Sequence, residues 1–304
     1  MALGDSYSSG AGLTPYLSGG VQCERSPRGY PSLVARDLVG VRLDFAACAG
    51  ATTAEIAHQV VAARSSLSRA SLVTLTAGGN DLGFSTLLRS CLGAVTSPAS
   101  TTVHYYTSSA GPAPCTAAVA NAAHLLGATV DPASGAVVGA PRVTARLLVA
   151  PSVLERRLES LVTSILRDTS RRRLVARVLV VSYPVLLASP SGPVCRVSDS
   201  PLRFSSTISL YPVVSSSAER ELTAVNELLR RETAAVVRTL GRATARLALV
   251  SPTSFAPISC RTGESSDLNG LSVASLLSGG SFHPTASGQA VFASAVRVSL
   301  RQRD

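Results

Sequence analysis

Four short stretches of the sequence hold residues that together could carry out nucleophilic acyl transfer. Ser6 lies in "GDS", Gly50 in "ACAGATT", Asn80 in "GGND" and His283 in "FHPT". This chemistry needs a nucleophile, a base that removes its proton, and hydrogen-bond donors where negative charge develops on oxygen. Ser6 is the candidate nucleophile and His283 the candidate base. The Gly50 N–H and the Asn80 side-chain amide are candidate donors to the oxyanion.

Each stretch alone is weak evidence, because Gly-Asp-Ser and Gly-Gly-Asn also occur in ordinary turns. The G-x-S-x-G elbow of many lipases does not fit, since position 8 is serine where a glycine is required. The prediction therefore rests on finding all four stretches in this order. Each of them also falls at the end of an expected strand or at the start of an expected helix.

The elements that would position these residues alternate between apolar strands and helices. Strands are expected at 41–50, 71–81, 176–184 and 246–252, and long helices at 151–173, 214–241 and 284–301. This alternation indicates a parallel sheet that is covered by helices on both faces. Such sheets bind ligands at the carboxyl ends of their strands. Ser6 follows a short apolar stub and is placed at that edge, while His283 is expected to cap a last helix that starts at Pro284.

The composition is that of a single globular domain, and we expect one domain over residues 1–304. The chain is 46% hydrophobic and 15% charged, which provides ample material for a core. Residues 92–142 are rich in Ala, Ser, Thr, Pro and Gly and are expected to form an irregular insertion that serves as a lid or wall. No transmembrane segment is expected, because no apolar run reaches the roughly 18 residues that a span requires.

The chain is strongly basic, with a net charge of +10, and all 28 basic residues are arginines. Nucleotide composition bias in the source genome explains this most simply. Contact with anionic lipid surfaces is the functional alternative, with the arginine cluster at 167–177 as one candidate. Nucleic-acid binding is not expected, because aromatic residues make up only 4% of the chain and do not alternate with basic ones.

Six cysteines indicate disulfide bonds and an oxidising compartment. The sequence leaves their pairing open, and sequential pairing closes the shortest loops. The predicted disulfides are therefore Cys23–Cys48, Cys91–Cys115 and Cys195–Cys260. No metal site or cofactor is expected, because the cysteines lack metal-ligand spacing and a neighbouring histidine. We expect a secreted, extracellular protein whose signal peptide is absent from this chain.

The order of Ser6, Gly50, Asn80 and His283 resembles the SGNH (GDSL) hydrolase family over essentially the whole chain. With its six cysteines, the sequence is similar to the secreted bacterial esterase, lipase and phospholipase branch. The resemblance implies a three-layer α/β/α sandwich with a central parallel sheet of about five strands. It also implies that Ser6 is the nucleophile and His283 the base. The Ser6 N–H, the Gly50 N–H and the Asn80 side chain would form the oxyanion hole.

The sequence departs from the family pattern at one position. The family usually has Asp three residues before the histidine, and here that residue is Gly280. We predict that the Gly280 carbonyl accepts from His283 Nδ1–H, which gives a Ser–His dyad in place of a triad. Asp267 and Asp199, each in a loop, are the alternative groups that would orient the histidine.

The sequence predicts a serine esterase that hydrolyses carboxylic esters of lipids through an acyl-enzyme on Ser6. One alternative is a carbohydrate O-acetyl esterase of the same fold, although the chain has no Trp to form a sugar-binding platform. A second alternative is a non-catalytic binding protein that has kept the fold. The missing Asp favours this second alternative, and the four intact residues speak against it. The sequence predicts no oligomeric state.

Overall fold

The structure, a computed structural model, is built around a parallel sheet. It describes residues 1–95, 104–105, 113–131, 136–139, 151–170, 176–188, 194–198, 201–203, 209–260, 265–270 and 280–302. Within these ranges the central sheet has four strands in the order β1 (Ala2–Gly4), β2 (Leu72–Thr76), β7 (Arg177–Val181), β11 (Leu247–Val250). Leu75 pairs with Leu3 on one side and with Val180 on the other. Because helices cover both faces, these strands are apolar nearly throughout.

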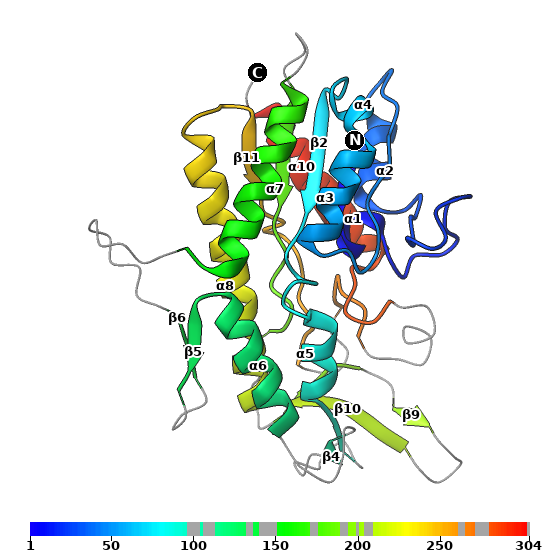
Figure 1. Cartoon of the computed structure of the whole chain (residues 1–304). Coiled ribbons are helices and arrows are strands. Elements are labelled where there is room, and N and C mark those ends of the chain that lie inside the picture. Colours follow the sequence, from blue (N-terminus) through cyan, green and yellow to red (C-terminus); the bar gives the residue numbers. More distant parts are fainter. Residues whose placement is uncertain are drawn as a thin grey trace.

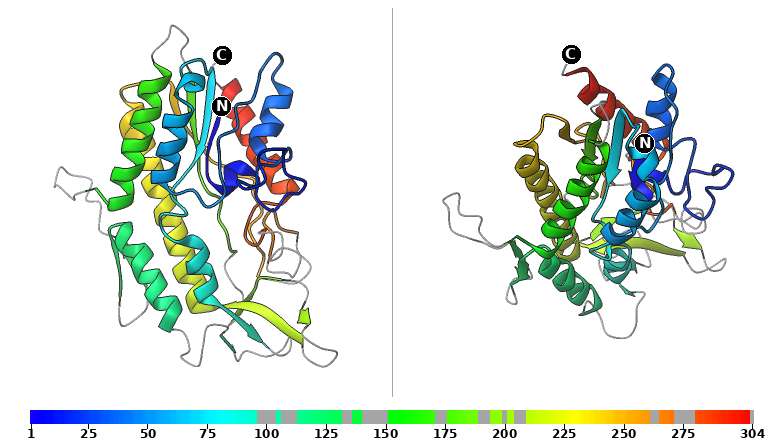
Figure 2. Two further views of the ribbon diagram at one scale, coloured as in Figure 1. Left: turned by 45° about the vertical axis from the view of Figure 1, so that its right-hand side comes forward. Right: turned by 45° about the horizontal axis from the view of Figure 1, so that its top comes forward.

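Two layers of helices cover the sheet (Figures 1 and 2). One layer contains α2 (Tyr30–Asp37) and α10 (Ala286–Arg301), which pack against each other. The other contains α3 (Thr53–Ala62), α7 (Val153–Thr169) and α8 (Ser216–Gly241). The short α4 (Arg64–Leu67) follows α3. The predicted α/β sandwich is thereby confirmed, and the three predicted long helices correspond to α7, α8 and α10.

The expected strand at 41–50 is not a full member of the central sheet. Within the described chain it contributes one parallel bridge, between Phe45 and Ala2. The N–H groups of Ala46 and Ala47 both bond to the Ala2 carbonyl, which interrupts the regular ladder after one pair. The prediction of about five strands is therefore wrong by one in the part of the chain that the structure describes.

A second, antiparallel sheet lies below the central one in Figure 1. Its strands run in the order β4 (His104–Tyr105), β3 (Leu92–Val95), β10 (Ser209–Ser215), β8 (Val194–Arg196), and β9 (Leu202–Arg203) also pairs with β10. Helices α5 (Phe84–Cys91) and α6 (Ala113–Leu125) and the hairpin of β5 (Ala128–Val130) and β6 (Val137–Gly139) belong to the same region.

The segment 92–142 is thus more regular than the sequence suggested. Its Ala-rich part forms α6, because alanine is the strongest helix former. The rest of the predicted insertion, at 96–103, 106–112, 132–135 and 140–142, lies outside the described residues.

Three disulfides join the cysteines in the predicted sequential pairs. Cys23–Cys48, Cys91–Cys115 and Cys195–Cys260 close loops with sequence separations of 25, 24 and 65 residues. On the chain-entropy model, each loop of this size stabilises the fold by about 3–4 kcal/mol.

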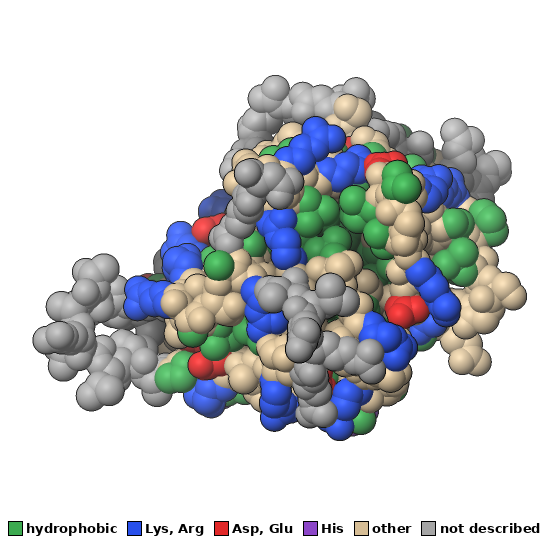
Figure 3. Space-filling view, turned by 90° about the horizontal axis from the view of Figure 1, so that it is seen from above, with side chains coloured by type: hydrophobic (Ala, Val, Ile, Leu, Met, Phe, Trp, Pro, Cys, Tyr) green, Lys and Arg blue, Asp and Glu red, His purple; other side chains and the backbone are tan. Residues whose placement is uncertain are grey.

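The basic charge is not confined to one edge of the molecule. Figure 3 looks onto the end where β1 and β2 begin, and arginine side chains are spread over it around an apolar hollow. This end is opposite the edge at which the parallel strands finish. In the described part of the chain, no helix has the length and hydrophobicity that crossing a membrane requires.

Candidate active site

Ser6 is the first residue of α1 (Ser6–Ser9), a single helical turn that begins directly after β1. The Asp5 carboxylate caps this turn by accepting from the Tyr7 N–H at 3.0 Å. Gly4 has a φ of +122°, and a Cβ there would lie 2.4 Å from the Thr76 carbonyl oxygen, so only glycine fits before the aspartate. The Ser6 N–H belongs to the first turn of the helix, where N–H groups have no partner within the helix.

Three of the four predicted residues line one cavity at the edge where the strands end. Ser6, Asn80 and His283 surround a cavity of about 180 Å³. Much of the remaining wall is apolar, with contributions from Phe84, Leu88, Leu92, Leu186, Leu229 and Phe282. Ser6 itself is 9% exposed, so the hydroxyl is partly shielded from solvent.

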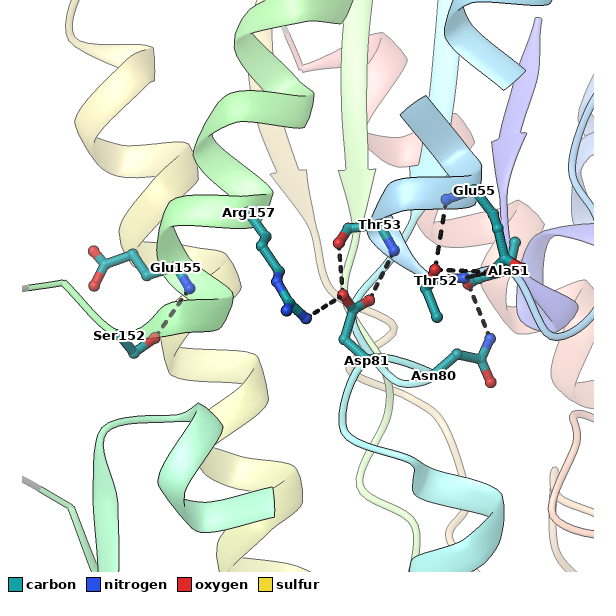
Figure 4. Close-up of polar contacts among 9 residues, drawn as sticks. All are labelled: Ala51, Thr52, Thr53, Glu55, Asn80, Asp81, Ser152, Glu155 and Arg157. Atoms are coloured by element: carbon teal, nitrogen blue, oxygen red, sulfur yellow. Dashed lines mark hydrogen bonds and ion pairs between the residues drawn. The ribbon is translucent and has the colours of Figure 1, made fainter. Parts of the chain in front are cut away.

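Gly50 lies beside this cavity and is not among the residues that line it. It is exposed and has a φ of +80°, a conformation that favours glycine. The Asn80 amide donates to the carbonyl of the next residue, Ala51, at 3.0 Å (Figure 4). This bond ties the Asn80 turn to the Gly50 loop. An amide has two N–H donors, so a second one remains for a ligand.

Asp81 fixes the same turn from its other side. Its carboxylate accepts from the Thr53 N–H at 2.8 Å and from the Thr53 hydroxyl at 2.6 Å, at the start of α3. Arg157 of α7 reaches the same carboxylate at 3.3 Å (Figure 4). The Asn80 turn is therefore held between α3 and α7.

Asp5 and Tyr183 connect the Ser6 turn to the Asn80 turn through buried hydrogen bonds. Asp5 is 1% exposed and accepts from the Thr76 hydroxyl at 2.7 Å and from the Tyr183 hydroxyl. Tyr183 in turn accepts from the Gly79 N–H at 3.0 Å. Sequence reasoning missed Tyr183, whose only signal was its place at the end of an expected strand.

Burial strongly affects the protonation of Asp5 and Tyr183. It raises the pKa of the Asp5 carboxyl, and the bonds from Tyr183, Thr76 and the Tyr7 N–H lower that pKa in part. Burial and the neighbouring Asp5 raise the pKa of the Tyr183 hydroxyl well above its usual value. Tyr183 therefore stays protonated at neutral pH and can act as a donor.

The carbonyl beside the histidine ring belongs to Ser281, which corrects the prediction of Gly280. His283 Nδ1 lies 3.1 Å from the Ser281 carbonyl oxygen. The Gly280 carbonyl instead accepts from the His283 main-chain N–H at 3.1 Å. Phe282 has a φ of 60°, so the chain turns tightly here and the carbonyl two residues before the histidine meets its ring.

Asp267 and Asp199 are the two alternative groups that would orient the His283 ring. The Asp267 carboxylate accepts from the Ala256 N–H at 2.9 Å, so it holds a loop and not the His283 ring. Asp199 lies outside the described residues. The cap of the last helix also differs from the prediction, because the Thr285 hydroxyl accepts from the Gly288 N–H and α10 starts at Ala286.

The histidine turn is joined to the serine turn by one buried bond. The Tyr7 hydroxyl donates to the Phe282 carbonyl at 2.9 Å. The Ser6 turn is thus linked both to the Asn80 turn and to the His283 turn, although the three come from distant parts of the chain.

Comparison with known proteins finds a family whose model matches nearly the whole chain. The model of the GDSL-like Lipase/Acylhydrolase family matches residues 2–291. A lipase of Streptomyces rimosus is 44% identical over 92 residues, which cover 30% of this chain and 33% of that protein. Lipase 1 of Streptomyces coelicolor is 39% identical over 92 residues, or 30% of this chain and 34% of the relative. The matched part thus spans about a third of these curated relatives.

Solved structures support the fold. The extracellular lipase of Streptomyces rimosus superposes with a TM-score of 0.63 at 24% identity, covering 98% of this chain and 97% of that one. Phospholipase A1 of Streptomyces albidoflavus gives a TM-score of 0.63 at 23% identity with the same coverage.

Proposed function

The chain belongs to the GDSL-like lipase/acylhydrolase family, and from this premise we propose that it is a serine esterase that hydrolyses carboxylic esters of lipids. The observation that carries the proposal is the cavity that Ser6, Asn80 and His283 line together with a largely apolar wall. A reactive serine beside an apolar cavity suits an ester whose acyl part is a hydrocarbon chain.

In the proposed reaction, His283 takes the proton from the Ser6 hydroxyl as its oxygen attacks the ester carbonyl. With Nδ1–H donating to the Ser281 carbonyl, the neutral ring has its lone pair on Nε2, which is the atom that accepts the proton. The oxyanion is stabilised by the Ser6 N–H, the Gly50 N–H and the Asn80 amide. His283 then protonates the leaving alcohol, and water releases the acyl group from Ser6 by the reverse proton transfers.

The orienting group in this proposal is a neutral carbonyl. Such an acceptor fixes the tautomer of His283 but stabilises the imidazolium less than a carboxylate does. The site therefore acts as a Ser–His dyad. We propose that the oxyanion donors contribute a larger share of the rate enhancement here than they would in a Ser–His–Asp triad.

Phospholipids are a second candidate substrate, favoured by a groove next to the cavity. The groove lies between α3 and α7, and its lining includes Asn80, Arg156, Arg157 and Arg167 together with Asp81 and Glu159. Arg157 is paired with Asp81, so an anionic head group would meet Arg156 and Arg167. Because Asn80 borders both spaces, a bound ester would place its acyl chain in the cavity and an anionic head group in this groove. The Streptomyces albidoflavus structural neighbour is described as a phospholipase A1.

We also propose that the protein is secreted and that it meets its substrate at anionic lipid surfaces. The three disulfides fit an oxidising compartment, and the Streptomyces rimosus neighbour is described as an extracellular lipase. A net charge of +10 favours approach to anionic lipid.

The test is hydrolysis of p-nitrophenyl esters from acetyl to palmitoyl by the wild type and by Ser6→Ala. We expect the activity of the wild type to be highest on acyl chains much longer than acetyl. In Ser6→Ala we expect the activity to fall by about 10⁴-fold or more, with an unchanged Tm. Ser65→Ala, an exposed serine on α4, is the matched control and should keep wild-type rates. Activity on acetyl esters alone would favour the carbohydrate esterase, and no activity on any ester would favour the binding protein.

A further inference from the structure

Helix α8 places one polar side chain in the wall of the cavity. Asn226 is 3% exposed and lines the cavity together with Leu229, which lies one turn further along the helix. Residues three apart share one side of a helix. Asn226 therefore belongs to the same surface as the apolar side chains that would meet an acyl chain.

The amide nitrogen of Asn226 is buried and has no hydrogen-bond acceptor among the described residues. The two tyrosine hydroxyls of the cavity are paired, since Tyr7 donates to the Phe282 carbonyl and Tyr183 to Asp5. Of the buried side-chain groups left without a partner, the Asn226 amide is the one that lines this cavity in the described chain.

An unpaired amide at this position is costly for the fold. A buried polar group loses its hydration and, without a partner, regains nothing. Asparagine is also a weaker helix former than leucine, which would pack into the wall without either cost. A ligand atom that pairs the amide would recover the lost interaction.

We propose that Asn226 is a polar subsite for an oxygen atom carried by the acyl chain itself. The enzyme would then prefer keto or hydroxy acyl groups over plain alkyl groups of the same length. The terminal torsion of asparagine is broad, so the amide can turn its N–H toward an oxygen that enters the cavity. This inference rests on the proposed esterase function, because it assigns the acyl group to the cavity.

The expected selectivity follows from what each substrate does to the amide. A keto oxygen pairs with the N–H, whereas a plain alkyl chain seals the cavity and leaves the amide unpaired. Sites built around a hydrogen bond discriminate strongly against ligands that lack it. We expect kcat/KM to favour the oxygenated ester by about 10-fold or more when its oxygen stands at the right carbon.

The experiment compares three pairs of p-nitrophenyl esters that differ only by the keto oxygen. The pairs are 4-oxopentanoate with pentanoate, 5-oxohexanoate with hexanoate, and 6-oxoheptanoate with heptanoate, each corrected for spontaneous hydrolysis. We expect one keto ester to exceed its partner by about 10-fold or more in the wild type. We expect the ratio to fall close to one in Asn226→Leu, with faster hydrolysis of the plain ester and a raised Tm.

Leu229→Met is the matched variant, because it changes the same wall without adding or removing a hydrogen-bonding amide. It should shift the preferred chain length and keep the keto preference. The wild-type ratios alone keep the inference testable if Asn226→Leu fails to fold.

Two results would overturn the inference while leaving the esterase intact. One is hydrolysis of the plain esters with all three keto ratios within twofold of one. The other is a keto preference that survives in folded Asn226→Leu. Hydrolysis of no ester in the series would overturn the proposed function, and the subsite with it.

Discussion

The turns that carry Ser6, Asn80 and His283 and the helical wall of the same cavity are held in place in different ways. The turns are joined by specific buried hydrogen bonds, such as Tyr7 to the Phe282 carbonyl and Tyr183 to Asp5. The helical wall consists largely of apolar side chains of α5 and α8, among them Phe84, Leu88 and Leu229. Changes in the turns should therefore lower kcat, and changes in the wall should alter substrate preference.

After Ser6→Ala, the largest effect that separates the two regions is expected for His283→Ala. Loss of the proposed base should lower kcat by about 10²–10⁴-fold, the usual range for general-base catalysis. Steady-state kinetics on a plain ester measure it. His58→Ala, an exposed histidine on α3, should leave kcat unchanged. Equal effects of the two variants would contradict the role of His283.

Asn80→Ala should come next, with a loss of about 10²–10³-fold in kcat. KM should change little, because in the proposed mechanism the amide donates to charge that appears only in the transition state. Asn80 also donates to the Ala51 carbonyl, so some loss of Tm is expected as well. Measuring kcat and Tm on one preparation separates these effects. If kcat falls less than about threefold while Tm drops, Asn80 serves only the turn.

Tyr183→Phe tests the link between the Ser6 turn and the Asn80 turn. The phenylalanine keeps the ring but loses the hydroxyl that donates to Asp5 and accepts from the Gly79 N–H. We expect kcat to fall by about 10-fold with KM nearly unchanged, and the free energy of unfolding to fall by about 1–3 kcal/mol. Tyr211→Phe on β10 is the control and should alter neither. A loss of stability with full kcat would make Tyr183 purely structural.

The smallest effect on turnover is expected in the wall, with Leu88→Ala. Leu88 is 6% exposed and lines the cavity, so its truncation enlarges the space for an acyl chain. We expect the ratio of kcat/KM for long over short esters to rise by about 3- to 10-fold. The void left by the truncated side chain should also lower the free energy of unfolding by about 2–5 kcal/mol. An unchanged acyl-length profile in the folded variant would show that the acyl chain binds elsewhere.

The same contrast explains what the sequence could and could not predict. Ser6, Asn80 and His283 lie in short motifs at the ends of elements, and local patterns are enough to place such residues at one edge of a parallel sheet. The Ser281 carbonyl escaped prediction because it depends on the positive φ of Phe282, which the sequence does not reveal. The roles of Tyr183 and Asn226 could not be predicted, because they depend on contacts between segments that are distant in the sequence.

The strand count and the helix cap failed for local reasons of the same kind. Segment 41–50 has the composition of a strand, but its backbone meets β1 in a single bridge. At the last helix, the Thr285 hydroxyl offered a side-chain cap two residues beyond His283, and that cap set the helix start.

The role of Ser6 as the nucleophile is tested by labelling the folded protein with a fluorophosphonate, followed by peptide mapping by mass spectrometry. The Ser6 oxygen should attack phosphorus and expel fluoride, because only an activated serine reacts quickly. We expect one phosphonylated residue, Ser6, with labelling slowed in Asn80→Ala and abolished in Ser6→Ala. Rapid labelling of another serine, or an active protein in which Ser6 stays unmodified, would contradict the claim that Ser6 is the nucleophile.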